Sequence, residues 1–207
     1  MTPQYGYNIK YIGGVIMINI TKSKIKFKKI ILRGKFFLHN LINCCIIRVQ
    51  ELKKGVLGMR KITVFDVAAY VLNKLSGKEI TTMKLQKLVY YCQAWSLAWD
   101  DVPLFAEDFE AWANGPVCRE LFEKHKGKFL ANIDMFSDAD ISIFNDTQRE
   151  TMDIVIRDLG DKSPHWLSEL THSERPWQEA RRGYAPGESC SVIISKEVMQ
   201  EYYGGLS

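Results

Sequence analysis

The chain has 207 residues, with 28 lysines and arginines against 24 aspartates and glutamates, so its formal net charge is +4. This length suffices for one domain with a core, or for one domain and an extension. Residues 1–58 carry 11 basic residues and one acid, whereas residues 59–207 carry 17 basic and 23 acidic residues. The second part, at −6, disfavours binding to nucleic acid, which usually requires a basic face.

Residues 1–58 form a basic leader rich in isoleucine and lysine, and its composition differs from the rest of the chain. Lys53-Lys54-Gly55-Val56 can be encoded by a purine-rich ribosome-binding sequence placed before Met59. We therefore expect synthesis to begin at Met59 and residues 1–58 to have no evolved structure, being a mis-assigned start or a disordered leader. The domain is then residues 59–207.

An alternative interpretation makes the leader a membrane anchor, because the run from Phe36 to Val49 is apolar. That run has only 14 residues and is interrupted by His39, Asn40 and Asn43, whereas a spanning helix needs about 20 residues. No small-residue cleavage site follows it, which also disfavours a secretory signal. We expect no membrane association.

The cysteines and histidines give no pattern typical of disulfides or metals. Cys92, Cys118 and Cys190 are an odd set without paired spacing, which favours a reducing, cytoplasmic compartment and buried thiols. His165 and His172 lack ligands at zinc spacing. We expect no metal and no cofactor.

After Met59 the pattern predicts a mainly α, compact single helical domain with a small β element. Thr63 and Asp66 form a capping-box-like helix start, and apolar residues follow at helical spacing as far as Ser76-Gly77. A second helix begins at Thr81 or Thr82, with an apolar stripe at Leu85, Leu88, Cys92, Trp95 and Trp99. Tyr90, Tyr91 and Gln93 lie partly off this stripe.

The middle of the domain alternates short elements with turns. Residues 109–113 alternate as a short strand does, and Asn114-Gly115-Pro116 predicts a turn with Pro116 at the first position of a helix that ends at Gly127. Residues 128–145 predict a loop with a small strand at Ile141–Phe144.

Four helix starts follow in the last third of the chain. A helix begins at Asp146 and ends at Gly160. Ser163 and Ser173 each precede a proline and predict two short helices, and Ser195 predicts the cap of the last one.

Three segments of the sequence resemble one known family. They are MKLQKLVYYCQAW in the second helix, then EAWANGPV, then SERPWQEAR from Ser173 to Arg181. Together they resemble the Panacea domain of SocA-like antitoxins, a family once grouped as phage-associated GepA-like proteins. The resemblance extends over about Phe65 to Tyr203 and departs slightly at Arg175, where an acid is common in the family.

The resemblance implies an antitoxin that binds and neutralises a cognate protein toxin, with a bacterial protease as a further partner if the domain acts as a proteolytic adaptor. It implies no small-molecule substrate. Candidate toxin-binding residues are aromatic anchors, a charged side chain and nearby polar groups: Tyr90, Gln93, Trp99, Trp112, Asn114, Trp177 and Arg181.

Two other classes of function were weighed against this one. No nucleophile elbow, histidine-bearing catalytic motif or phosphate-binding glycine loop occurs, so we expect no enzyme. A DNA-binding regulator would use Lys84 and Lys87 near the start of the second helix. This alternative, and that of a phage-associated interaction protein, stay open at the level of the sequence.

Overall fold

The structure, a computed structural model, describes residues 7–12, 15–20, 60–75 and 79–206. The chain divides into two units, Met1–Met59 and Arg60–Ser207. In the first unit, β1 (Tyr7–Ile12) and β2 (Val15–Ile20) pair as an antiparallel hairpin. The proposed start at Met59 and the apolar run from Phe36 to Val49 lie outside the described residues.

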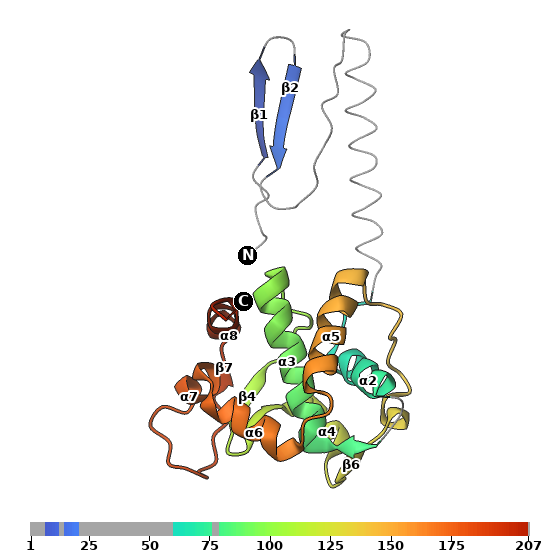
Figure 1. The fold of residues 1–207 in the computed structure, drawn as a ribbon, viewed down its shortest axis with the longest axis vertical. Helices are drawn as coiled ribbons and strands as arrows, with labels where there is room; N and C mark the ends of the chain where they lie inside the picture. Colours follow the sequence, from blue (N-terminus) through green and yellow to red (C-terminus); the bar gives the residue numbers. More distant parts are fainter. Residues whose placement is uncertain (1–6, 13–14, 21–59, 76–78, 207) are drawn as a thin grey trace. The chain divides into compact units, whose positions relative to one another are not determined.

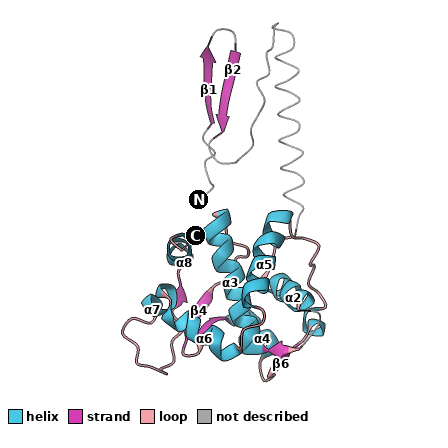
Figure 2. Cartoon of the chain, in the orientation of Figure 1, coloured by secondary structure: helices cyan, strands magenta, loops and turns pink. Residues whose placement is uncertain are grey.

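The second unit is mainly helical with small β elements, as the sequence predicts (Figure 2). Its elements in chain order are α2 (Val64–Lys74), β3 (Ile80–Thr81), α3 (Thr82–Asp100), β4 (Phe109–Trp112), β5 (Gly115–Cys118), α4 (Arg119–His125), β6 (Leu130–Ala131), the 3-10 helix η1 (Ile133–Phe136), α5 (Asp146–Leu159), α6 (Pro164–Ser173), α7 (Arg175–Ala180), β7 (Ile193–Ile194) and α8 (Lys196–Gly204). Strands β5, β4 and β7 form one antiparallel sheet in that order, and β3 pairs with β6.

Helix α3 lies at the centre of this unit (Figure 1) and packs against α2, α5, α6, α8 and β5. The predicted stripe residues Leu85, Leu88 and Cys92 are buried. Tyr90 and Gln93, which the single-stripe pattern places towards the edge, are also fully buried. The reason is that α3 has neighbours on all sides rather than on one, so one apolar stripe does not describe it.

Most predicted helix starts are confirmed by capping hydrogen bonds. Thr63 N–H donates to Asp66 Oδ2 at 2.8 Å, and Thr81 Oγ1 accepts from the N–H of Lys84 at 3.2 Å. Ser163 and Ser195 accept in the same way at the starts of α6 and α8. These bonds satisfy N–H groups that have no partner within the helix.

The predicted cap at Ser173 is wrong. Ser173 is the last residue of α6, where its hydroxyl donates to the carbonyl of Leu170 at 2.7 Å, and Glu174 occupies the N-cap position of α7. A serine hydroxyl can bond back to the preceding turn as readily as it caps the next helix.

The segment after Asn114 also differs from its prediction, because Pro116 lies in strand β5 and the helix begins only at Arg119. Pro116 is opposite Ala111 of β4. Proline has no N–H to donate and is therefore found on edge strands, and β5 is an edge of its sheet.

The strand predicted at Ile141–Phe144 is absent, since these residues form turns. Arg149 accounts for this, because its guanidinium donates to the carbonyls of Ile141 at 2.8 Å and Phe144 at 3.0 Å. Because these carbonyls converge on one guanidinium, the backbone of this segment cannot adopt the extended conformation of a strand.

Candidate functional site at the β4–β5 hairpin

The turn between β4 and β5 closes directly onto two helices. Gly115 pairs with Trp112 and has a φ of +96°, a conformation that residues with a Cβ rarely adopt. A Cβ at Gly115 would lie 2.7 Å from both Lys87 Cε of α3 and Thr171 Oγ1 of α6. The glycine of the NGP turn is therefore required both by backbone geometry and by the close approach of the hairpin.

Beneath this hairpin lies a buried lysine. Lys87 is 1% exposed, and its ammonium donates to the carbonyl of Pro116 at 3.0 Å. Among the residues that the structure describes, no carboxylate forms an ion pair with Lys87. Burial without a negative partner lowers the pKa of Lys87 to about 7.

Gln86, the residue before Lys87, binds the last residue of β5, the strand that contains Pro116. Its amide donates to the carbonyl of Cys118 at 3.2 Å and accepts from the N–H of Cys118 at 2.9 Å. The same amide nitrogen lies 3.0 Å from His125 Nε2. Adjacent side chains of α3 thus bind the two ends of β5.

A groove with a volume of about 400 Å³ opens beside the hairpin. Its lining residues come from the start of α3, the hairpin, α4 and the loop before β7: Thr82, Met83, Gln86, Lys87, Trp112, Ala113, Asn114, Val117, Phe122, His125, Gly187, Ser189 and Cys190. Lys87 is the one lysine or arginine among them, and no acid lines the groove. Burial lowers the pKa of His125, so this side chain is neutral at pH 7.

Trp112 and Trp177, both candidate toxin-binding residues, lie together at this site. Trp112 is half-buried, packs against Phe122 with ring centroids 4.8 Å apart, and has the guanidinium of Arg119 5.7 Å from its ring. The indole N–H of Trp177 donates to the carbonyl of Trp112 at 2.9 Å. Asn114, at the exposed tip of the turn, is held by the hydroxyl of Ser168, which donates to its carbonyl.

Arg181 reaches the same hairpin from below, but it is not available to a partner. Its guanidinium donates to the carbonyls of Ala111 at 2.8 Å and Glu188 at 2.7 Å, and only 6% of the residue is exposed. The expectation that Arg181 makes a charge-assisted contact with a toxin is therefore corrected. It instead ties the loop before β7 to β4.

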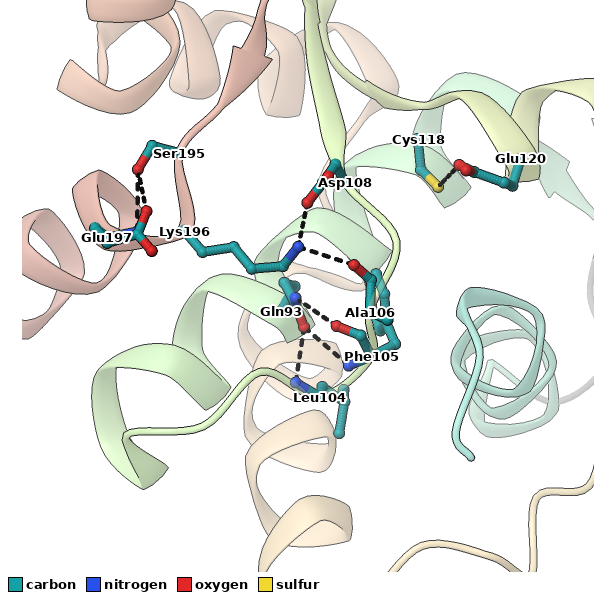
Figure 3. Close-up of polar contacts among 10 residues, drawn as sticks. All are labelled: Gln93, Leu104, Phe105, Ala106, Asp108, Cys118, Glu120, Ser195, Lys196 and Glu197. Carbon is teal, nitrogen blue, oxygen red and sulfur yellow. Dashed lines mark hydrogen bonds and ion pairs between the residues drawn. The ribbon is translucent and has the colours of Figure 1, made fainter. Parts of the chain in front are cut away.

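Gln93 and Tyr90 are likewise internal. Figure 3 shows Gln93 accepting from the N–H groups of Leu104 and Phe105, and its amide donates to the carbonyl of Phe105 at 3.0 Å. The following residues are held from α8, where Lys196 donates to the carbonyl of Ala106 at 2.9 Å and pairs with Asp108. Gln93 thus fixes the α3–β4 loop, and no surface of it is exposed for a partner.

Tyr90 packs its ring against Tyr91, Phe109 and Tyr203, and it has no exposed surface. Its burial conflicts with direct contact to a toxin. Tyr90 therefore belongs to the core between α3, β4 and α8.

Trp99 is exposed but lies away from the hairpin. It is 39% exposed and stacks on Trp95 with ring centroids 4.6 Å apart. Lys87 and Trp99 are separated by about 18 Å along the helix axis at about 1.5 Å per residue. The structure thus groups Trp112, Asn114 and Trp177 and separates Trp99 from them.

Lys87 is a functional candidate that the sequence suggested only within the alternative of DNA binding. As a DNA-recognition residue it would have to project from the surface, yet it is buried beneath Gly115. The sequence contained a partial signal, because the helix repeats apolar residues around position 87. The contact partners, however, lie in segments remote along the chain, which a helical pattern does not identify.

The thiol of Cys118, at the end of β5, is not activated for reaction. Cys92, Cys118 and Cys190 are free and buried, and burial raises the pKa of the Cys118 thiol to about 12, which disfavours a reactive thiolate. Within residues 60–75 and 79–206, no cluster of histidine, cysteine and acid side chains has the geometry of a metal site. None of the helices in the described part of the chain is long and apolar enough to cross a membrane.

Residues 85–178 match the family model described as antitoxin SocA-like, Panacea domain. This segment is a Panacea domain. No curated protein and no solved structure matches the chain. The family recognised from the sequence is confirmed, and it indicates a role related to toxin–antitoxin systems with a protein toxin as the general kind of partner.

The Panacea segment contains the central part of the site. It includes most of α3, the β4–β5 hairpin, α4 to α6 and the start of α7. Lys87, Gly115 and Trp112 therefore fall within it, whereas Arg181 and the loop that closes the groove lie beyond its end.

Proposed function

We propose that the chain is the antitoxin of a toxin–antitoxin pair and that it binds and neutralises its cognate toxin at the groove beside the β4–β5 hairpin. One observation supports this proposal: the Panacea segment contains most of the residues that line the groove. Neutralisation requires a surface that holds the toxin and requires no catalytic group.

Trp112 is the leading anchor in this proposal. Protein interfaces draw much of their binding energy from a few aromatic side chains seated in partly desolvated pockets. Trp112 lines the groove, is half-buried and retains exposed ring surface. Met83, 38% exposed, stands at the same groove as a flexible apolar contact.

The experiment is growth rescue by co-expression. The open reading frame next to this gene is induced in bacteria with and without the 207-residue chain, and in parallel with the form that begins at Met59. Relief of toxicity supports neutralisation, and relief by the shorter form shows that residues 1–58 are dispensable for it. If the neighbour is toxic and neither form rescues growth, the proposal is wrong for this pair.

A matched pair of variants locates the interface. We expect Trp112→Ala to lose rescue while its melting temperature stays near that of the wild type, and Trp99→Ala, an exposed tryptophan at the other end of α3, to keep rescue. Equal rescue by both variants would place the interface elsewhere. A Trp112→Ala protein that also unfolds early would instead assign the tryptophan to packing.

Neutralisation has two routes, occlusion of the toxin and its delivery to a bacterial protease. Measuring the toxin level during rescue separates them, because occlusion leaves the toxin present and delivery removes it. Rescue that disappears in a host lacking the protease supports the adaptor route.

A further inference from the structure

Beside the groove lies a surface that combines exposed apolar side chains with lysines. Phe129 is 78% exposed, and Met83 and Leu130 are 38% and 40% exposed. They are neighbours through the backbone, because the N–H of Thr82 donates to the carbonyl of Phe129 at 3.0 Å and Leu130 pairs with Thr81. We call this surface, together with the groove and the lysines named below, the basic apolar face.

The charges on these segments are mostly positive. Lys84 stands on α3 next to Met83, and Lys124, Lys126 and Lys128 lie on or just after α4. Among the described residues, Lys84, Lys124 and Lys128 form no ion pair, although Asp161 acts electrostatically on Lys84 and the ammonium of Lys124 lies 5.9 Å from the centroid of the Phe65 ring. Lys126 pairs with the neighbouring Glu123 at 3.3 Å. Residues 59–207 are net −6 as a whole, so this face opposes the charge of the domain that carries it.

Lys87 adds a buried amino group at the groove wall. Its ammonium has three N–H groups and one hydrogen-bond partner, the carbonyl of Pro116. Buried charges are normally paired, because an unpaired one carries a large desolvation cost. The groove that Lys87 lines contains no acid. A carboxylate from outside would complete this arrangement.

We propose that the basic apolar face docks an acidic segment of the toxin that also carries apolar residues, and that one carboxylate of this segment enters the groove and pairs with Lys87. The apolar residues pack on Phe129 and Met83, and further acids lie against Lys84, Lys124 and Lys128. This inference rests on the proposed function for the identity of the partner. It names the chemistry that the toxin presents.

The face fits a protein better than a nucleic acid. A phosphate backbone would pair with the exposed lysines, but it offers nothing to the exposed side chains of Phe129, Met83 and Leu130. A peptide with alternating acidic and apolar side chains satisfies both the charge and the apolar surface.

The first test needs no toxin. Random peptides displayed on phage are selected on the immobilised 207-residue chain, and peptides selected on the wild type are then measured on two double variants: Lys124→Glu/Lys128→Glu, and the control Lys162→Glu/Arg182→Glu. The control reverses two exposed cations that are not among the residues of this face and that form no ion pair within the part of the chain that the structure describes. Enriched peptides should combine acids with apolar residues, and their affinity should fall about tenfold or more on the first variant only.

Lys87→Met tests the buried contact separately. The melting temperature should not fall, because a methionine fills the space without a buried charge. Affinity for the selected acidic peptide should fall about tenfold, and replacing each acid of that peptide by its amide in turn should identify one position that matters on the wild type and not on Lys87→Met. Unchanged affinity, with the melting temperature retained, overturns the pairing.

Other outcomes overturn the proposal as a whole. They are selection that yields no enriched peptide, enrichment without acids, or equal loss on both double variants. A short DNA duplex that binds the wild type in a salt-sensitive manner and loses binding on Lys124→Glu/Lys128→Glu would assign the face to nucleic acid instead.

Rescue experiments separate this inference from the function on which it rests. If the wild type rescues growth and Lys124→Glu/Lys128→Glu rescues equally well, the antitoxin role stands and the docking face is wrong. If the wild type does not rescue but acidic peptides are selected through Lys87, the face stands and the toxin assignment is wrong.

Discussion

Lys87 and Glu174 are both buried and ionisable, but they differ in how far hydrogen bonds within the chain compensate for their burial. Glu174 is 6% exposed and accepts hydrogen bonds from the hydroxyls of Tyr91 at 3.0 Å and Tyr203 at 2.6 Å, so it joins α3 to α8. Burial raises the pKa of Glu174 to about 7. Lys87 has one carbonyl partner, and burial lowers its pKa, also to about 7.

The hydrogen-bond partners of the two residues distinguish a side chain that links internal elements from one that can still bind a partner. Glu174 is surrounded by donors on the same chain, and its aromatic neighbours close the region. Lys87 borders a groove and has N–H groups without acceptors among the described residues. Burial is shared by both, so the inventory of hydrogen-bond partners is the property that separates them.

The largest effect is expected where the hairpin meets Lys87. Gly115→Ala should lower the free energy of unfolding by about 3 kcal/mol, because it combines a strained φ with overpacking against α3 and α6. Urea denaturation measures the change. Gly183→Ala is the matched control, since Gly183 has a φ of +94° but nothing within 4 Å of its Cβ position, and it should cost about 1 kcal/mol. Equal costs would refute the close approach of the hairpin.

Lys87→Met should change how stability depends on pH. In the wild type, the unfolded chain holds a proton between pH 7 and 10.5 that the folded protein has released, so the free energy of unfolding rises with pH in this window. The rise is at most about 1.4 kcal/mol per pH unit. The variant should lose this rise and equal or exceed the wild type at pH 7. Urea titrations across this window that coincide for the two proteins would contradict the burial of the charge.

Glu174→Gln should show a smaller effect of the opposite sign. The folded pKa lies above the unfolded value of 4.5, so wild-type stability falls as the pH rises from 4.5 to about 7. The glutamine variant keeps an acceptor for Tyr91 and Tyr203 and should be flat across this range, with a stability at pH 8 no lower than that of the wild type. A variant that melts much earlier at every pH would show that the amide cannot replace the carboxyl between the two hydroxyls.

Trp99→Ala should give the smallest change. Its ring is 39% exposed and rests on Trp95, so we expect a loss of about 1 kcal/mol in the free energy of unfolding. Thermal melts of this variant and of Trp95→Ala sharpen the contrast, because the ring of Trp95 also packs on Tyr203 at 5.4 Å. A larger loss for Trp99→Ala would mean that the end of α3 is less exposed than the structure describes.

Local signals in the sequence predicted most of the helix starts, since a capping side chain acts within three residues of its position. Thr81 and Ser195 are examples. The prediction that Pro116 begins a helix was wrong because proline is compatible with both a helix start and an edge strand. Which of the two it adopts depends on pairing with Ala111. That partner is only five residues away, so the choice depends on whether the turn at Ala113-Asn114 closes a hairpin or leads into a helix.

The candidate site was partly predictable for the same reason. Trp112, Asn114 and Trp177, three of the candidates named from the sequence, lie close together, but whether they contact a toxin stays a prediction. Arg181 looked exposed because long charged side chains usually are, and one of its carbonyl partners, Ala111, lies 70 residues away along the chain. Helix propensity likewise says nothing about how many neighbours surround α3, which is why Tyr90 and Gln93 were placed too near the surface.

Strand β5 carries a consequence for how this protein meets others. Pro116 has no N–H, and both backbone groups of Cys118 are occupied by the amide of Gln86. The ring of Pro116 and the side chain of Gln86 therefore block the outer edge of β5, so another strand cannot form backbone hydrogen bonds along it. A partner strand therefore cannot extend the sheet at the β5 edge, and recognition at this edge depends on side chains.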